Sequence, residues 1–200
     1  MDIKDVLRVF RKSGGIMRLT QARASGIQTR DLSKLVAEGK LIKEDVGIYR
    51  LSDLDLTENI ELALVSMKSP EAVICLVSAL SFHDLTTQIP KHIDIALPPA
   101  KTRKPKLERV KCSIYVVSGE AYSSGIEVHK IHGIDVKIYS KEKTLADCFK
   151  FRNKIGLDIA LEALGMWASQ KRKNINLLME YARVCRVAKI IRPYLEAQFG

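Results

Sequence analysis

Residues 20–51 read TQARASGIQTRDLSKLVAEGKLIKEDVGIYRL, and this stretch decides the fold of the first part of the chain. Its polar and apolar residues divide into a short helix over 21–24 and a longer helix over 29–38, joined by a turn that contains Gly26. Two threonines are placed to cap these helices, Thr20 and Thr29. One face of the longer helix is apolar and carries Leu32, Leu35 and Val36. The spacing therefore predicts a helix-turn-helix.

The residues on either side complete a known arrangement. Upstream, residues 2–12 carry apolar side chains at helical spacing, and Ser13-Gly14-Gly15 ends that helix. Downstream, residues 41–43 and 48–51 alternate as two short strands around a polar turn, which predicts a hairpin. A helix-turn-helix followed by a hairpin is a winged helix, and we expect this domain to span residues 1–52.

The second helix of the predicted winged helix presents polar residues at its start, where a DNA-reading helix meets base edges. We expect base contacts from Gln28, Thr29, Arg30, Ser33 and Lys34. Basic residues around this helix would contact phosphates without reading sequence, namely Arg18, Arg23, Lys40, Lys43 and Arg50. The alternative is a winged helix that contacts only other proteins, and Asp31 on the same helix counts slightly in its favour.

Charge along the chain supports the first alternative. The 200 residues include 33 Lys and Arg against 23 Asp and Glu, a formal net charge of +10. Residues 1–51 hold 11 basic and 6 acidic side chains, whereas residues 52–98 hold 2 and 7. An acidic macromolecule such as nucleic acid is the partner that this excess of positive charge favours. The basic loop 100–111, AKTRKPKLERVK, is either a second phosphate contact or a solvated loop.

Residues 53–200 predict a second, larger domain. Helical patterns cover 57–68 and begin again at Ser69-Pro70-Glu71, and strand patterns then follow at 92–97, 112–117, 126–131 and 134–139. Helical spacing returns over 144–153, 157–169 and 174–192. Because the strands form one block between helices, we expect an α+β domain with a small antiparallel sheet and C-terminal helices.

No known enzyme or metal motif is present in the sequence. There is no phosphate-binding glycine loop, no G-x-S-x-G and no H-E-x-x-H, so we expect a protein that is not an enzyme and that needs no cofactor. The pair Asp53-x-Asp55 is interpreted as a helix-entry cap rather than a metal site. Four cysteines lie far apart, and we expect them to be buried thiols. No apolar run is long enough for a membrane span or a secretory signal, which predicts a cytoplasmic protein.

Three stretches carry a family resemblance. The opening stretch is the one quoted above, the middle stretch is SPEAVICLVSALSFHDLTTQIP at 69–90, and the late stretch is GIDVKIYSKEKTLADCFKFRNKIGLDIALEAL at 133–164. The combination of S-A-L-x-x-H-x-L-T with T-x-x-D-C-F-x-x-R is specific. On these residues the chain resembles AbiEi-type antitoxins, the regulators of bacterial type IV toxin–antitoxin systems, which act in abortive infection against phage.

This resemblance implies a two-part protein. The winged helix would repress the protein's own operon at an inverted repeat in double-stranded promoter DNA. The second domain would counter a nucleotidyltransferase-like toxin encoded beside it, without needing a stable complex with that toxin. The resemblance assigns antitoxicity to Ser78, His83, Asp147, Phe149 and Arg152, in motifs that also contain Leu85 and Thr144. Asp84 stands where the family pattern has glycine, which affects only the local turn.

The residues themselves leave other interpretations open. Thr144 and Asp147 have the spacing of a capping box, Phe149 shares a helix face with Leu145, and Arg152 could pair with a carboxylate. The chain could also be a winged-helix transcription factor that responds to a small ligand. A third interpretation is an enzyme that acts on nucleic acid or on the toxin, and the missing phosphate-binding loop argues against it.

Overall fold

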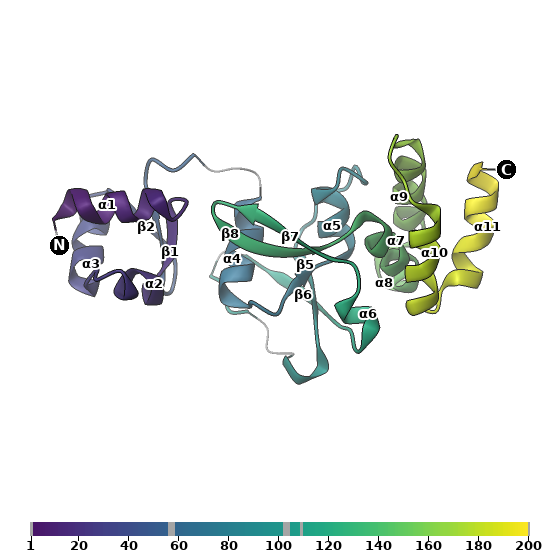
Figure 1. Ribbon diagram of the computed structural model, residues 1–200, viewed down its shortest axis with the longest axis horizontal. Coiled ribbons are helices and arrows are strands. Elements are labelled where there is room, and N and C mark those ends of the chain that lie inside the picture. The colour runs from purple at the N-terminus through teal and green to yellow at the C-terminus, as the bar shows by residue number, and fades with distance from the viewer. Residues whose placement is uncertain (1, 56–58, 102–104, 109, 200) are drawn as a thin grey trace. The chain divides into compact units, whose positions relative to one another are not determined.

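The computed structural model describes residues 2–55, 59–101, 105–108 and 110–199. Contacts divide the chain into two compact units (Figure 1). The first unit comprises residues 1–70 together with two short segments, 105–110 and 129–136. The second unit comprises 71–104, 111–128 and 137–200.

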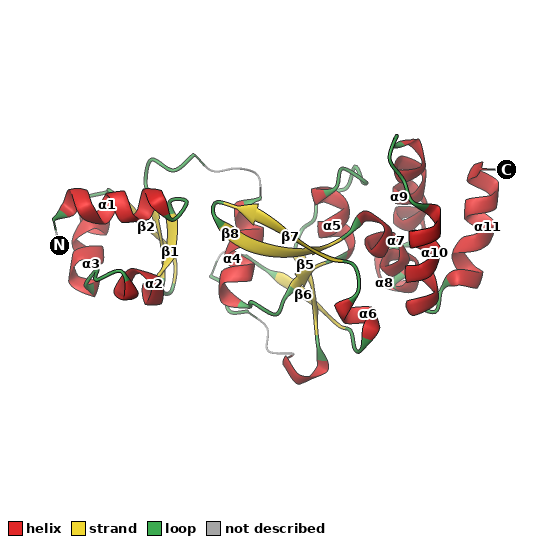
Figure 2. Cartoon of the chain, viewed as in Figure 1, coloured by secondary structure: helices red, strands yellow, loops and turns green. Residues whose placement is uncertain are grey.

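The first unit contains the winged helix that the sequence predicts. Its helices are α1 (Ile3–Lys12), α2 (Leu19–Ala24), α3 (Thr29–Ala37) and α4 (Ile60–Lys68). Its strands are β1 (Ile16–Arg18), β2 (Leu41–Asp45) and β3 (Ile48–Leu51), which form an antiparallel sheet in the order β1-β3-β2 (Figure 2). The apolar faces of α1 and α3 share one core, built around Phe10, Leu32 and Leu35.

Three details of this unit differ from the sequence-based expectation. The helix expected over 29–38 includes Thr29 as its first residue, so Gln28, and not Thr29, stands at the cap position. The helix expected over 21–24 begins at Leu19, so Thr20 lies inside it and does not cap it. Gln21 instead accepts a hydrogen bond from the backbone N–H of Arg18 at 2.8 Å, which secures the first turn. Strand β1 was not predicted, because three residues are too few to show an alternating pattern.

Helix α4 confirms the helix expected up to Lys68, and Asn59 precedes its first residue. The expected cap, Thr57, lies outside the described residues. The interpretation of Asp53 as a helix-entry cap is wrong, because this carboxylate lies in a turn and pairs with Arg11 at 3.0 Å. Both side chains of this pair are more than half exposed.

The remaining strands form a five-stranded sheet. Its order is β6-β5-β4-β8-β7, with bounds Cys112–Val116, Ile93–Leu97, Val73–Ile74, Ile134–Tyr139 and Ile126–Ile131. Strands β4 and β5 are antiparallel, whereas β4 with β8 and β5 with β6 are parallel. The α+β class is confirmed, and the sheet contains parallel pairs beside its antiparallel ones.

One expected helix is replaced by a strand. Ser69-Pro70-Glu71 was expected to start a helix, but a turn lies there and β4 follows, with Val73 paired to Ala96. The helix α5 (Leu76–Phe82) begins only after Cys75. Residues 72–76 are all buried, and a short apolar run of this kind does not distinguish a central strand from a buried helix.

The C-terminal part of the second unit is helical. Its elements are α6 (Glu120–Ser123), α7 (Lys141–Lys150), α8 (Arg152–Ile155), α9 (Leu157–Ser169), α10 (Ile175–Val184) and α11 (Ala188–Phe199), and a 3-10 turn (Pro99–Lys101) precedes β6. Helix α7 packs against α5, α9, α10 and α11, as Figure 1 shows. Burial of α7 on several sides places two of its charged residues, Lys143 and Asp147, in the core.

The ends of these helices refine the expected boundaries. Helix α7 begins at Lys141, three residues before the expected start, because the Ser140 hydroxyl accepts a hydrogen bond from the N–H of Lys143. The pattern expected over 174–192 forms two helices that are separated at 185–187, and the second continues past Pro193. All four cysteines are buried and free, as expected. No helix among the described residues is long and apolar enough to cross a bilayer.

Candidate nucleic-acid interface and the buried motif residues

The start of α3 presents the polar face expected of a DNA-reading helix. Leu32 and Leu35 are buried against the core, which turns the opposite face of the helix outward. The five residues expected to contact bases are all exposed, namely Gln28, Thr29, Arg30, Ser33 and Lys34. The Arg30 side chain is 80% exposed and is 3.9 Å from Asp31. At that distance and exposure the guanidinium stays available to a partner.

The residues expected to contact phosphates divide into two groups. Lys40 and Lys43 are exposed, and Arg23 donates to the Thr29 hydroxyl at 3.0 Å from an exposed position. In contrast, Arg50 forms an ion pair with Glu44 in which both side chains are nearly buried. Arg18 donates to the carbonyl of Ser66 at 3.3 Å. The structure therefore brings the first group to the surface near α3 and engages the second group in contacts within the protein.

The turn of the wing is held by a buried carboxylate. Asp45 is only 3% exposed and accepts hydrogen bonds from Lys68 Nζ and from the backbone N–H of Glu108, each at 2.7 Å. Lys68 also donates to the carbonyl of Val46 at 2.7 Å. Burial acts to raise the pKa of Asp45, but the hydrogen bonds from Lys68 and Glu108 outweigh it and lower that pKa. This brace fixes the hairpin within the first unit.

Two motif residues of the second unit hold strands and helices together. The Ser78 hydroxyl accepts from the N–H of Asp94 at 2.8 Å and donates to the carbonyl of His92 at 3.3 Å. His83 is buried, and its Nε2 lies 2.7 Å from the carbonyl oxygen of Tyr139. Asp84, at the position of the family's glycine, has φ +55°, which is the left-handed conformation that glycine adopts most easily. These contacts give both motif residues a structural role.

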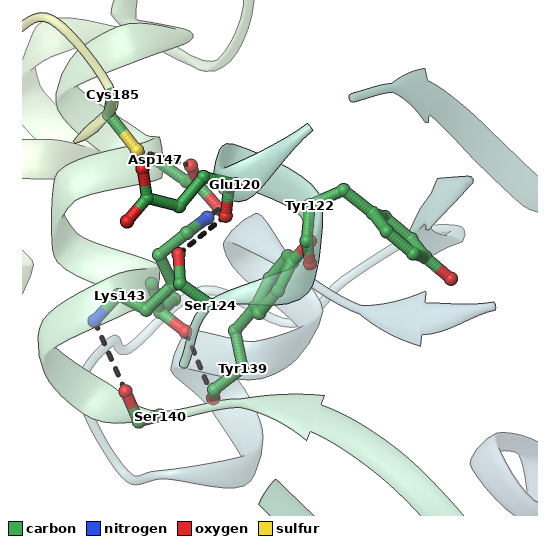
Figure 3. Close-up of polar contacts among 9 residues, drawn as sticks. Glu120, Tyr122, Ser124, Tyr139, Ser140, Lys143, Asp147 and Cys185 are labelled. Atoms are coloured by element: carbon green, nitrogen blue, oxygen red, sulfur yellow. Dashed lines mark hydrogen bonds and ion pairs between the residues drawn. The ribbon is translucent and has the colours of Figure 1, made fainter. Parts of the chain in front are cut away.

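The late motif surrounds a buried ion pair, shown in Figure 3. Asp147 Oδ2 accepts from Lys143 Nζ at 2.5 Å, and the two side chains are 2% and 0% exposed. Asp147 Oδ1 accepts from the thiol of Cys185 at 3.2 Å, and Lys143 Nζ lies 3.9 Å from the centre of the Tyr139 ring. Burial raises the pKa of Asp147, and the Lys143 ammonium opposes that shift. Each charge of the pair is therefore balanced by its partner, and the Cys185 thiol and the Tyr139 ring add further contacts.

The capping-box interpretation of Thr144 and Asp147 is therefore wrong. Ser140 caps α7, and the Thr144 hydroxyl donates to the carbonyl of Tyr139 at 3.2 Å. Phe149 is fully buried beside Leu145, as the helical spacing predicted. Arg152 was expected to pair with a carboxylate, but it donates to the carbonyl of Phe149 at 2.8 Å. The late motif thus holds together the centre of the second unit.

Two residues that are prominent in the structure were not selected from the sequence, namely Lys143 and Asp94. Lys143 lies four residues before Asp147, a spacing that predicts an ion pair but not its burial. Asp94 is buried in β5 and accepts hydrogen bonds from the backbone N–H groups of Val77 and Ser78 at the start of α5. Burial raises the pKa of Asp94 to about 6. Its place in a run of apolar strand residues was the only signal for it.

No group of three or more His, Cys, Asp or Glu side chains in the described part of the chain is arranged to hold a metal ion.

The burial of the cysteines has a clear effect on their chemistry. It raises the pKa of Cys185 to about 12, and it raises the pKa values of Cys75 and Cys148 well above the ordinary thiol value. These thiols are therefore protonated packing groups at neutral pH.

A winged helix with an exposed polar recognition helix, joined to an α+β unit, defines the class of fold. The crystal structure of the RV2827C protein from Mycobacterium tuberculosis is similar, with a TM-score of 0.56 at 14% sequence identity. The alignment covers 96% of this chain and 78% of that chain. At this identity the likeness shows the fold alone.

One family model matches the first part of the chain. Residues 4–52 match the model of a family described as "Transcriptional regulator, AbiEi antitoxin". This match confirms the resemblance that the sequence predicts. A comparison with curated protein sequences gave no significant match. The class of function that these findings support is an antitoxin-type transcriptional regulator.

Proposed function

We propose that this protein is the antitoxin and transcriptional autorepressor of a bacterial type IV toxin–antitoxin operon, and that it acts in the cytoplasm without catalytic activity. The exposed polar start of α3 carries this proposal, since it lies within the residues that match a family of transcriptional regulators. The positive charge of residues 1–51, with 11 basic and 6 acidic side chains, supports a DNA partner.

Recognition of DNA would use two kinds of contact. Arg30 and Gln28 provide the paired hydrogen-bonding groups that suit base edges in the major groove. Lys40, Lys43 and Arg23 are exposed cations that suit phosphates. Because Arg50 and Arg18 are engaged within the protein, their contribution would require those contacts to open. We therefore expect the exposed group to dominate binding to an inverted repeat.

Antitoxicity is assigned to the second unit. Of its motif residues, Ser78, His83, Asp147 and Phe149 are buried and Arg152 is half-buried. Buried side chains cannot themselves touch a separate protein, so they would act by maintaining the surface that opposes a nucleotidyltransferase-like toxin. A stable complex with the toxin is not required by this arrangement.

The first experiment compares binding to the DNA upstream of the protein's own coding region with binding to a scrambled duplex, by fluorescence anisotropy across a salt series. We expect a preference of about 10³ or more and a steep dependence on salt. Equal and weak binding to both duplexes would contradict autorepression and would favour a winged helix that binds proteins.

Point variants separate base reading from phosphate contact. Arg30→Ala should weaken binding to the operator by about 1–3 kcal/mol and reduce discrimination, whereas Lys43→Ala should weaken all sequences alike and reduce the salt slope by about 1. Arg8→Ala removes an exposed cation from α1 and serves as the control. Unchanged discrimination in the Arg30 variant would refute the assignment of α3 as the reading helix.

A co-expression assay tests the second part of the proposal. Cells that express the neighbouring toxin gene should grow only when this protein is also present. The Arg30→Ala variant should still protect, because its substitution leaves the second unit intact. Failure of the unaltered protein to protect would exclude the antitoxin role and leave a transcription factor.

A further inference from the structure

The second unit contains a cavity of about 510 Å³. It opens where the C-terminal ends of α7 and α10 approach the segment between β6 and α6. We call it the α7–α10 pocket and define it by its lining residues, which are 118–121, Lys150 and 184–186. A volume of this size lies in the range of sites for small molecules.

The charges that line the pocket are not neutralised within the protein. Among the described residues, Lys150 and Arg186 make no ion pair with a carboxylate. The Lys150 ammonium lies 5.6 Å from the centre of the Phe151 ring. The Glu120 carboxylate, also in the lining, makes no hydrogen bond to a described residue. The pocket therefore offers two cations to an anion and one carboxylate to a hydrogen-bond donor.

The backbone at Arg186 gives this side chain particular significance. Arg186 has φ +60° and follows the last residues of α10, where its N–H bonds the carbonyl of Arg183 at 2.9 Å. The N–H of Val187 bonds the carbonyl of Ala182 at 2.7 Å. This is the helix ending at which glycine is the usual residue. The backbone conformation alone would thus favour glycine at position 186. The presence of arginine there suggests that its side chain has a role in the pocket.

The buried network described above reaches the pocket through one residue, Cys185. Cys185 donates to Asp147, which in turn accepts from Lys143, and Figure 3 draws these three residues. Cys185 precedes Arg186, and Asp147 lies one helical turn before Lys150. The network therefore ties α7, which carries Lys150, to the C-terminal end of α10, which precedes Arg186. The neutral thiol adds no competing negative charge to the cavity.

We propose that the α7–α10 pocket binds a small organic oxyanion, in which a phosphate or carboxylate group lies between Lys150 and Arg186 and a hydroxyl or amine group donates to Glu120. Arginine and lysine together provide planar and point-charge contacts to such a group. This site is independent of the DNA interface, since all of its lining residues belong to the second unit.

The test uses the full-length protein, with thermal unfolding and isothermal titration calorimetry. Ribose 5-phosphate and citrate are the phosphate and carboxylate probes, and ribose is the uncharged control. A ligand that binds only the folded state raises the melting temperature with concentration. We expect a saturable rise with at least one oxyanion and none with ribose. The absence of a saturable signal at about 10 mM of either oxyanion, well above the range of ordinary metabolite sites, would overturn the proposal.

Variants distinguish a built site from general charge attraction. Arg186→Gly should leave the unliganded protein at least as stable as the unaltered chain, because glycine relieves the positive φ, and yet weaken the oxyanion by about tenfold or more. Lys150→Gln should weaken the same probe. Arg183→Gln removes an exposed cation of α10 that does not line the pocket, and it should bind the probe normally. Equal losses in all three variants, or in none, would overturn the proposal.

Discussion

Helices α3 and α7 have similar lengths and charge contents, and the protein uses them in opposite ways. Helix α3 buries two leucines and exposes Arg30 and Lys34. Helix α7 buries seven consecutive residues, and an ion pair between Lys143 and Asp147 is among them. Helix α3 packs on the core of the first unit through one face, whereas α7 contacts α5, α8, α9, α10 and α11. The same residue types are therefore available for recognition in one unit and structural in the other.

The comparison shows which charges tolerate change. An exposed charge is hydrated in both the folded and the unfolded protein, so its removal changes the free energy of unfolding little. A buried charge has lost its water, and it depends on its partner for compensation. Substitutions in α3 should therefore alter binding, and substitutions in α7 should alter folding.

The largest expected effect is at the buried pair. Lys143→Met should destabilise the protein by about 3–5 kcal/mol, since it leaves the buried Asp147 carboxyl without its partner, where it either stays charged in the core or takes up a proton. Urea unfolding can be followed by the fluorescence of Trp167, the single tryptophan, which is buried in the second unit. The double variant Lys143→Met with Asp147→Leu is the matched control, and it should recover most of the loss. A double variant no more stable than the single one would show that the pair is not the cause.

A second effect comes from Asp94, whose folded pKa of about 6 lies above its ordinary value of 3.8. The folded state binds a proton more readily than the unfolded chain, so this group's stabilising contribution is complete below about pH 4 and is lost as the pH rises through 6. The loss at pH 7 should be up to about 3 kcal/mol. Asp94→Asn should remove this part of the pH dependence between pH 4 and 7. Asp84→Asn, at an exposed site, should leave the profile unchanged, and a parallel change in both variants would refute the assignment.

A smaller effect on stability is expected at Gly14, which packs against the turn at residues 132–133 within the first unit. A Cβ at Gly14 would lie 2.6 Å from the carbonyl carbon of His132, and Gly14 has φ +84°. Gly14→Ala should therefore destabilise by about 1–3 kcal/mol, combining backbone strain with overpacking. Gly26→Ala shares the positive φ, at +81°, but a Cβ there meets no atom within 4 Å. Thermal unfolding followed by circular dichroism should place the Gly26 variant well above the Gly14 variant.

The smallest effect is expected at an exposed ion pair. Arg11 and Asp53 are joined at 3.0 Å, and their side chains are 61% and 63% exposed. Arg11→Ala should change the free energy of unfolding by less than about 0.5 kcal/mol. A loss of 2 kcal/mol or more, on the order of the buried-site effects above, would contradict the distinction between the two kinds of charge.

Residues with a clear period were predicted well. The apolar spacing of α1, α3 and α9 and the alternation of β5, β7 and β8 each identified an element near its observed bounds. Short or fully buried segments were not predicted. Strand β1 has only three residues, and β4 lies in an unbroken apolar run, so neither shows a period. The helix expected at Ser69 failed for this reason: a proline that suits a helix start is equally suited to a turn before a strand.

The candidate sites differ in the same manner. The exposed face of α3 follows from helical geometry and from the positions of Leu32, Leu35 and the partly buried Val36, so the sequence located it. The pocket between α7 and α10 joins residues 118–121 to residues 150 and 184–186. No local pattern relates segments so distant in sequence, because their approach depends on how the helices pack on the sheet.

The sequence by itself determined the winged helix, the α+β class and the polar face of α3, because these depend on periodicity and on turn residues within a few positions of each other. Only the tertiary structure decided that Lys143 and Asp147 are buried together, that Asp94 binds the start of α5, and that Lys150 and Arg186 line one cavity. Burial and pairing are properties of the neighbours that a residue acquires on folding. The identity of a charged residue in the sequence does not show whether water or protein will surround it.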